Sequence, residues 1–131
     1  MKTCSTLLRQ AIVASVLAAH ASAGFAADAC DSTLGAQLFA MCSACHALRT
    51  TAPQREGPHL QGLFGRRAAS VPQFSYSPAL QSSQWIWNAE LLDRWLTKPQ
   101  RTLPGTTMTF VGLKSPAERA AVICYLETET K

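Results

Sequence analysis

Apolar side chains recur at the spacing of an amphipathic helix in three segments of the chain, and the alternation typical of a β-strand is almost absent. The segments cover residues 32–41, 89–98 and 116–127. In the first of them, Gly35 leaves room for another helix to approach closely. The sequence therefore predicts an all-α fold. The apolar positions of the three helices are Leu34, Leu38, Phe39, Leu91, Leu92, Trp95, Leu96, Ala121, Val122, Tyr125 and Leu126.

Capping residues and helix breakers flank these segments. Short polar side chains are placed to accept hydrogen bonds from the first free N–H groups of each helix, and a proline ends the second. The third helix opens with a capping box and a proline at its first position. The residues concerned are Asp31 or Ser32 for the first helix, Asn88 and Pro99 for the second, and Ser115, Pro116 and Glu118 for the third. A further short helix is predicted over residues 78–82.

The pentapeptide Cys42-Ser43-Ala44-Cys45-His46 has the Cys-x-x-Cys-His spacing at which a c-type haem is attached covalently. Two thiols one helical turn apart can each add to one haem vinyl group and form a thioether. The histidine that follows then lies under the porphyrin, where an imidazole nitrogen can bind the iron. The motif therefore predicts one covalent haem c on Cys42 and Cys45, with His46 as an iron ligand.

Three other interpretations of the two cysteines are weaker. A thioredoxin-like redox pair would lie near a strand–helix–strand pattern, and no such pattern surrounds Cys42. A zinc site would need a second ligand pair at metal-binding spacing, but the other cysteines and histidines stand alone in the sequence. A chance match in an exported chain stays open. The isolated residues are Cys4, Cys30, Cys124, His20 and His59.

Residues 49–73 are rich in glycine and proline, which predicts a long loop. A loop of this length without secondary structure is unusual in a compact domain. A haem removes the difficulty, because loops can wrap a large planar cofactor instead of packing on one another. A single small domain also has a core of marginal stability, so we expect the cofactor to contribute substantially to folding.

The N-terminus has the pattern of a secretory signal peptide. A basic start precedes an apolar run over residues 11–19, and Ala21-Ser22-Ala23 is a small-x-small cleavage site. We therefore expect a signal peptide over residues 1–23, with a second candidate cleavage after Ala26, and one domain over residues 24–131. The apolar run is too short to span a membrane, so we expect a soluble periplasmic protein.

The formal charge of +4 overstates the basicity of the mature protein. Of the 12 Lys and Arg residues, Lys2 and Arg9 leave with the signal peptide, so ten remain against eight acidic residues. No basic run with interleaved aromatic residues indicates nucleic-acid binding, and no repeat is present.

A second motif supplies a candidate for the sixth iron ligand. Residues 103–108, Leu-Pro-Gly-Thr-Thr-Met, place a thioether on a Pro-Gly turn. A sulfur ligand favours ferrous iron and raises the reduction potential relative to a second imidazole. A lone methionine otherwise fills core space. Met41 fits that role or a surface position, because it is too close to Cys42 to reach the opposite haem face. The motif therefore predicts Met108 as the second axial ligand.

With these motifs the chain resembles the class I, mitochondrial-type cytochromes c and their soluble bacterial relatives, from Gly35 to Leu126. The resemblance implies the small all-α cytochrome c fold, in which crossed N- and C-terminal helices, further helices and loops surround one covalent haem. Gly35 and Phe39 should meet Tyr125 where those helices cross. The matching motifs also include Gly57-Pro58, Leu60-x-Gly62-Leu63-Phe64-Gly65-Arg66, Phe74-x-Tyr76, Trp87, Leu96-x-x-Pro99, Pro104-Gly105-Thr106-x-Met108 and Phe110.

The resemblance also implies supporting roles around the haem. The carbonyl of Pro58 should accept the second ring N–H of His46 and thereby fix its tautomer. A guanidinium and several polar hydrogens should surround a buried haem propionate and compensate its charge. The residues that match this polar shell are Arg66, Tyr76 and Trp87, with hydroxyl groups from Ser77 and Thr106.

Several positions depart from the family pattern. Leu80 replaces an asparagine, and Trp95 replaces the tyrosine that lies beside the methionine ligand. The indole of Trp95 still offers a donor that can reach the sulfur. The ring of lysines used for docking is thinned, because Met41, Gln100 and Thr107 occupy positions where lysines are common.

The resemblance implies a monohaem electron carrier, not an enzyme. We expect a monomer that moves single electrons between respiratory or photosynthetic proteins, from a cytochrome bc-type complex or a dehydrogenase to a terminal oxidase. The alternative is a haem enzyme or gas-binding sensor with a labile sixth ligand, and the motif around Met108 argues against it. The redox partners, the reduction potential and the pairing of Cys30 with Cys124 stay open at this point.

Overall fold

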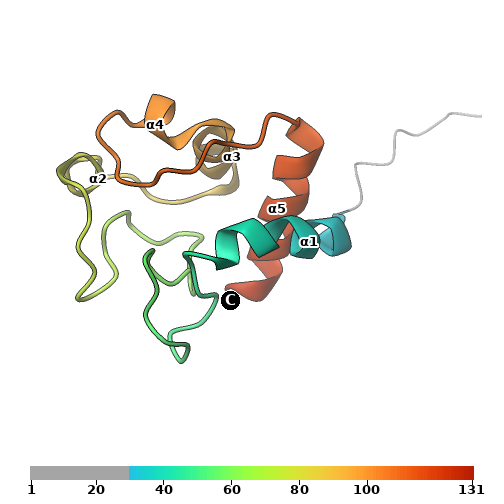
Figure 1. The fold of residues 1–131 in the computed structure, drawn as a ribbon, viewed down its shortest axis with the longest axis horizontal. Coiled ribbons are helices and arrows are strands. Elements are labelled where there is room, and N and C mark those ends of the chain that lie inside the picture. Colours follow the sequence, from blue (N-terminus) through green and yellow to red (C-terminus); the bar gives the residue numbers. More distant parts are fainter. Residues whose placement is uncertain (1–29) are drawn as a thin grey trace, which may run out of the picture.

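The computed structural model describes residues 30–131, so the expected signal peptide and both candidate cleavage sites lie outside the described residues. Helices joined by long loops make up the described chain (Figure 1). Within residues 30–131 the sole strand-like pairing is an isolated bridge between Arg67 and Ile86, and the expectation of an all-α fold is confirmed. The helices are α1 (Ser32–Ser43), α2 (Pro78–Ser82), α3 (Ala89–Thr97), α4 (Pro99–Thr102) and α5 (Pro116–Glu129).

The predicted caps start the three main helices. Asp31 accepts a hydrogen bond from the third residue of α1 at 2.8 Å, and Asn88 does the same for α3 at 2.8 Å. Ser115 accepts from the backbone N–H of Glu118 at 3.4 Å. Both terminal helices run two residues further than predicted. The sequence missed α4: Pro99 ends α3 as expected, but its fixed φ and missing N–H also suit the first position of a new helix.

The terminal helices α1 and α5 cross in close contact (Figure 1). A Cβ at Gly35 would collide with the backbone oxygen of Ala121 and would lie 2.7 Å from Cβ of Tyr125. The rings of Phe39 and Tyr125 pack beside this point, with centroids 5.4 Å apart. The expected crossing of Gly35 and Phe39 with Tyr125 is therefore confirmed. Of the predicted buried face of α5, Ala121, Val122 and Leu126 are buried and Tyr125 is partly buried. The helix also buries Ile123 and Cys124, because it packs on α3 as well as on α1.

Gly35→Ala should lower the free energy of unfolding by about 2–3 kcal/mol, because the added methyl meets backbone that cannot move aside. Chemical denaturation of the purified protein measures the change. Gly62→Ala is the control: a Cβ at Gly62 meets nothing within 4 Å, and only its positive φ of 65° opposes alanine, at a cost of about 1 kcal/mol. Equal losses in the two variants would show that the helix crossing tolerates a side chain.

A disulfide joins Cys30, just before α1, to Cys124 in α5, with Cα atoms 5.6 Å apart. This answers the question that the sequence leaves open. The bond lies at the crossing of the terminal helices and closes a separation of 94 residues. An oxidised pair of this kind agrees with an exported protein.

Replacing Cys30 and Cys124 together with alanine should lower the free energy of unfolding by about 4–5 kcal/mol, because the disulfide restricts a long loop in the unfolded chain. The measurement is guanidinium denaturation of the haem-loaded protein. Treating the wild-type protein with a dithiol should reproduce the loss without any substitution. A wild-type protein whose denaturation midpoint does not move on reduction would contradict this stabilising role.

Candidate functional site

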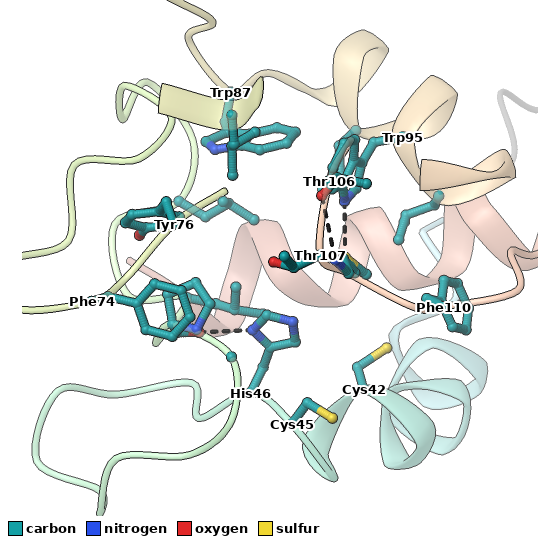
Figure 2. Close-up of a pocket in the computed structure, with 18 of the residues that line it drawn as sticks. Cys42, Cys45, His46, Phe74, Tyr76, Trp87, Trp95, Thr106, Thr107 and Phe110 are labelled. Atoms are coloured by element: carbon teal, nitrogen blue, oxygen red, sulfur yellow. Dashed lines mark hydrogen bonds between the residues drawn. The ribbon is translucent and has the colours of Figure 1, made fainter. Parts of the chain in front are cut away.

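The end of α1, the long loop, α3 and the segment 103–113 enclose one cavity of about 350 Å³. Figure 2 shows Cys42, Cys45 and His46 on one side of this space and Trp87 and Trp95 on the other. Met108 lines the same cavity. The structure thus brings together all four side chains for which the sequence predicts bonds to the haem or its iron. The apolar remainder of the wall includes Phe39, Leu60, Leu63, Phe74, Leu92, Leu96 and Phe110.

The two cysteines of the motif are unpaired thiols at the cavity edge. Backbone hydrogen bonds to the carbonyl of Cys42, from Cys45 N at 3.0 Å and from His46 N at 2.9 Å, continue the helical turn beyond α1. Burial, with a smaller effect of the neighbouring Cys45, raises the pKa of Cys42 to about 11, so its thiol is protonated at neutral pH. Helix α1 separates these thiols from Cys30 by roughly 17 Å, well beyond disulfide reach.

His46 is held by the residues that follow it in the loop. Its Nδ1 lies 2.7 Å from the carbonyl oxygen of Pro58 and donates to it, as the resemblance implies, so Nε2 is left with a free lone pair. Burial lowers the pKa of His46, against the opposing effect of the Pro58 carbonyl, and the charge of Arg66 lowers it further. A Cβ at Gly57 would lie 2.5 Å from Cε1 of His46. A neutral imidazole in one fixed orientation is therefore available as a ligand.

Two hydrogen bonds position Met108, one to its sulfur and one from its backbone N–H. Nε1 of Trp95 donates to Sδ of Met108 at 3.2 Å, and Met108 N donates to Oγ1 of Thr106 at 3.4 Å (Figure 2). Gly105 has a φ of 89°, which the Pro-Gly turn before the methionine requires. The tryptophan that departs from the family pattern thus keeps a hydrogen bond on the sulfur, and a second lone pair of the sulfur is left for a metal.

The predicted propionate shell lines the cavity, but three of its members also serve the fold. Arg66 donates to the carbonyls of Gln61 and His59 at 2.5 and 3.0 Å, and within the described residues it pairs with no carboxylate. The hydroxyl of Tyr76 accepts from Val71 N at 3.3 Å. Ser77 caps α2, which leaves its hydroxyl hydrogen free. The role of these residues toward a propionate stays a prediction, as do those of Trp87 and Thr106.

Sequence reasoning missed two charged residues that line the cavity, Glu56 and Arg67. Oε2 of Glu56 lies 3.7 Å from Sγ of Cys45, within the distance of a weak S–H hydrogen bond. Its position directly before Gly57 and Pro58 is the only signal that could have drawn attention to it.

The cavity suits an iron porphyrin better than a bare metal ion. No three His, Cys, Asp or Glu side chains between residues 30 and 131 gather closely enough to hold a metal. Instead, one imidazole and one thioether line an apolar cavity that also exposes two thiols, which is the donor set of a covalent haem with a nitrogen and a sulfur ligand.

None of the described helices is long and apolar enough to cross a bilayer.

Comparisons with known proteins agree with this donor set. A family model described as cytochrome c matches residues 32–130. Cytochrome c2 of Rhodomicrobium vannielii is 40% identical over 122 residues, 93% of this chain and 95% of that protein. Cytochrome c of Cochliobolus lunatus is 42% identical over 102 residues, 77% of this chain and 94% of that protein. The structure of cytochrome cH from Methylobacterium extorquens, 34% identical, superimposes with a TM-score of 0.70 over 75% of this chain and 98% of that one.

The chain therefore belongs to the cytochrome c family as a class I member, and the family implies a covalently bound haem c with its iron.

Proposed function

We propose that this protein is a single-electron carrier with one haem c, joined to Cys42 and Cys45 and bound axially by His46 and Met108. The observation that carries the proposal is the pair of positioned ligands. Pro58 fixes the histidine tautomer and Trp95 fixes the methionine sulfur, and both ligand side chains line one apolar cavity. With both of these ligands supplied by the chain, the iron would have no open site for a substrate.

The bound haem would supply the change between ferric and ferrous iron. The chain's residues would set its environment. The apolar walls exclude water from the iron. Little solvent therefore has to rearrange when the charge on the iron changes. The sulfur of Met108 favours the ferrous state. The guanidinium of Arg66, which no carboxylate within the described residues neutralises, would offset a propionate.

Visible absorption spectra and a redox titration of the exported protein test this proposal. We expect a low-spin c-type spectrum in both oxidation states, a reversible one-electron transition, and only weak carbon monoxide binding to the ferrous protein. The alternative, a haem enzyme or gas-binding sensor, requires a labile sixth ligand, so ready binding of carbon monoxide would favour it over a carrier.

We further propose that the carrier works in the periplasm, which the expected signal peptide and the Cys30–Cys124 disulfide both support, and that it works as a monomer. Its donor would be a cytochrome bc-type complex or a dehydrogenase, and its acceptor a terminal oxidase. The thioether edge of the haem would lie beside Cys42 and Cys45. Two exposed apolar residues adjoin residues of the cavity wall: Met41, directly before Cys42, at 48% exposure and Val111, directly after Phe110, at 83%.

Electron transfer to an acidic partner should depend only modestly on salt above about 0.1 M, where the Debye length is about 10 Å, because the mature chain has few excess positive charges. Stopped-flow kinetics across a salt series measures this. Arg55→Glu combined with Lys114→Glu should slow association mainly at low salt, whereas Phe110→Ser should slow transfer at every salt concentration. A salt dependence as steep as that of a strongly basic relative would show that the basic residues are focused at the docking edge.

A further inference from the structure

In the described part of the chain, Arg119 is the one charged residue that is buried, at 8% exposure. It belongs to α5, but the hydrogen bonds of its side chain all reach residues outside that helix. Its Nε donates to Oδ1 of Asp93 on α3 at 2.7 Å, and its Nη1 donates to the carbonyls of Leu113 and Lys114, both at 3.0 Å. A buried charge with three good partners fixes the geometry of the groups it joins.

Leu113 and Lys114 close the segment that carries Met108. This segment leaves α4 at Leu103, whose N–H donates to the carbonyl of Pro99 at 2.9 Å. At its other end, Leu113 N donates to the carbonyl of Leu96 at 2.8 Å. The segment therefore runs along the cavity, and backbone hydrogen bonds hold one of its ends against α4 and the other against α3.

The end near Leu113 is also packed tightly. A Cβ at Gly112 would collide with the carbonyl oxygen of Thr97, so the backbone there lies directly on the end of α3. Met108 itself makes its hydrogen bonds with Thr106 in the same segment and with Trp95 on α3. The distance between the Trp95 donor and the Met108 sulfur thus depends on how the segment is held against α3.

Arg119 holds both sides of that contact. Its bond to Asp93 reaches α3 two residues before Trp95, and its bonds to Leu113 and Lys114 reach the end of the methionine segment. A lysine could keep the charge but has no planar fork of donors with which to satisfy a carboxylate and two carbonyls at once.

We propose that Arg119, paired with Asp93, is a positioning residue for the Met108 ligand: it clamps the end of the methionine segment to the helix that carries Trp95. The inference rests on the proposed function, because it needs Met108 on the iron. In this arrangement the clamp keeps the sixth iron position closed, and loosening it raises the fraction of molecules in which the sulfur has left the iron.

The test uses the ferric haem-loaded protein and imidazole as a competing ligand. The apparent affinity for imidazole is the intrinsic affinity multiplied by the fraction of molecules with an open sixth position. Arg119→Lys should raise the apparent affinity about tenfold and should weaken the far-red absorption band of a methionine–ferric iron bond. Asp93→Asn, a milder change at a half-exposed side chain, should act in the same direction. Arg94→Lys, the same substitution at an exposed arginine of α3, should change neither property.

The Met108→Ala background separates positioning from general destabilisation. If Arg119 acts through the methionine, Arg119→Lys should leave imidazole affinity unchanged once Met108 is already alanine. Hydrogen exchange at the amide of Leu113 should become about tenfold faster in Arg119→Lys, which reports the loosened segment directly.

Two results would overturn the inference. One is a lower melting temperature in both clamp variants with unchanged imidazole affinity. The other is an affinity gain of equal size with and without Met108. If instead the proposed function is wrong and Met108 does not bind the iron, the wild-type ferric protein will lack the methionine band altogether.

Discussion

Replacing both Cys42 and Cys45 with alanine should leave little folded protein after export. The cavity of about 350 Å³ is lined by apolar side chains of the hydrophobic core, which α1, α3, α5 and the long loop contribute. Without a covalent haem, the apolar side chains that face this space lose their partner. A chain this small does not bury enough other surface to compensate.

The loss of folded structure should differ between parts of the chain. The disulfide between Cys30 and Cys124 survives the substitutions, so some helical contact between α1 and α5 should persist. The rest of the cavity wall, including α3 and the segment 103–113, should open. Circular dichroism should therefore show residual helix without a cooperative melt, and limited proteolysis should cut the long loop rapidly.

The matched control is the Cys30→Ala, Cys124→Ala variant, which also lacks two cysteines but keeps the attachment motif. It should be exported with haem and should melt cooperatively at a lower temperature. Recovery of a compact, cooperatively melting apo domain from the Cys42→Ala, Cys45→Ala variant would be incompatible with a haem-centred core.

The features that could be predicted from sequence are those set by short stretches of chain. Caps such as Asn88 and Ser115 act within one helical turn, so the helix starts agree with the structure. The spacing of Cys42, Cys45 and His46 is likewise a local chemical requirement. The structure's own contribution is to bring Met108, more than sixty residues further along the chain, into the same cavity as His46.

What sequence reasoning missed depends on contacts between distant segments. Arg119 stands in a helix pattern where a charged residue is expected to face solvent, and only the approach of α3 and residues 113–114 makes it a buried clamp. The Cys30–Cys124 bond could be neither asserted nor excluded until α1 and α5 were seen to cross at that level. Helix α4 was missed because proline both ends and begins helices, and the sequence signal is the same in both cases.

Met108→Ala should open the sixth iron position. The wild-type ferrous protein should bind carbon monoxide poorly, and the ferrous variant should bind it readily. The ferric variant should likewise bind cyanide readily. If the open state makes up about one part in a hundred of the wild-type protein, removal of the sulfur raises apparent affinity about 100-fold. The hydrogen bond donor of Trp95 strengthens the expectation, because its N–H loses its acceptor and is left facing the vacated position.

The same substitution should lower the reduction potential, since the ferrous state loses the soft ligand that favours it. A 100-fold preference of the sulfur for ferrous over ferric iron corresponds to about 120 mV for a one-electron couple. Redox titration of the purified variant measures the change. Met41→Ala is the control, because Met41 is half-exposed beside the attachment motif and makes no ligand contact in this proposal. If Met108→Ala keeps the wild-type potential and stays closed to carbon monoxide, the sixth ligand is a different side chain, and the proposal that the Pro-Gly turn delivers the iron ligand is wrong.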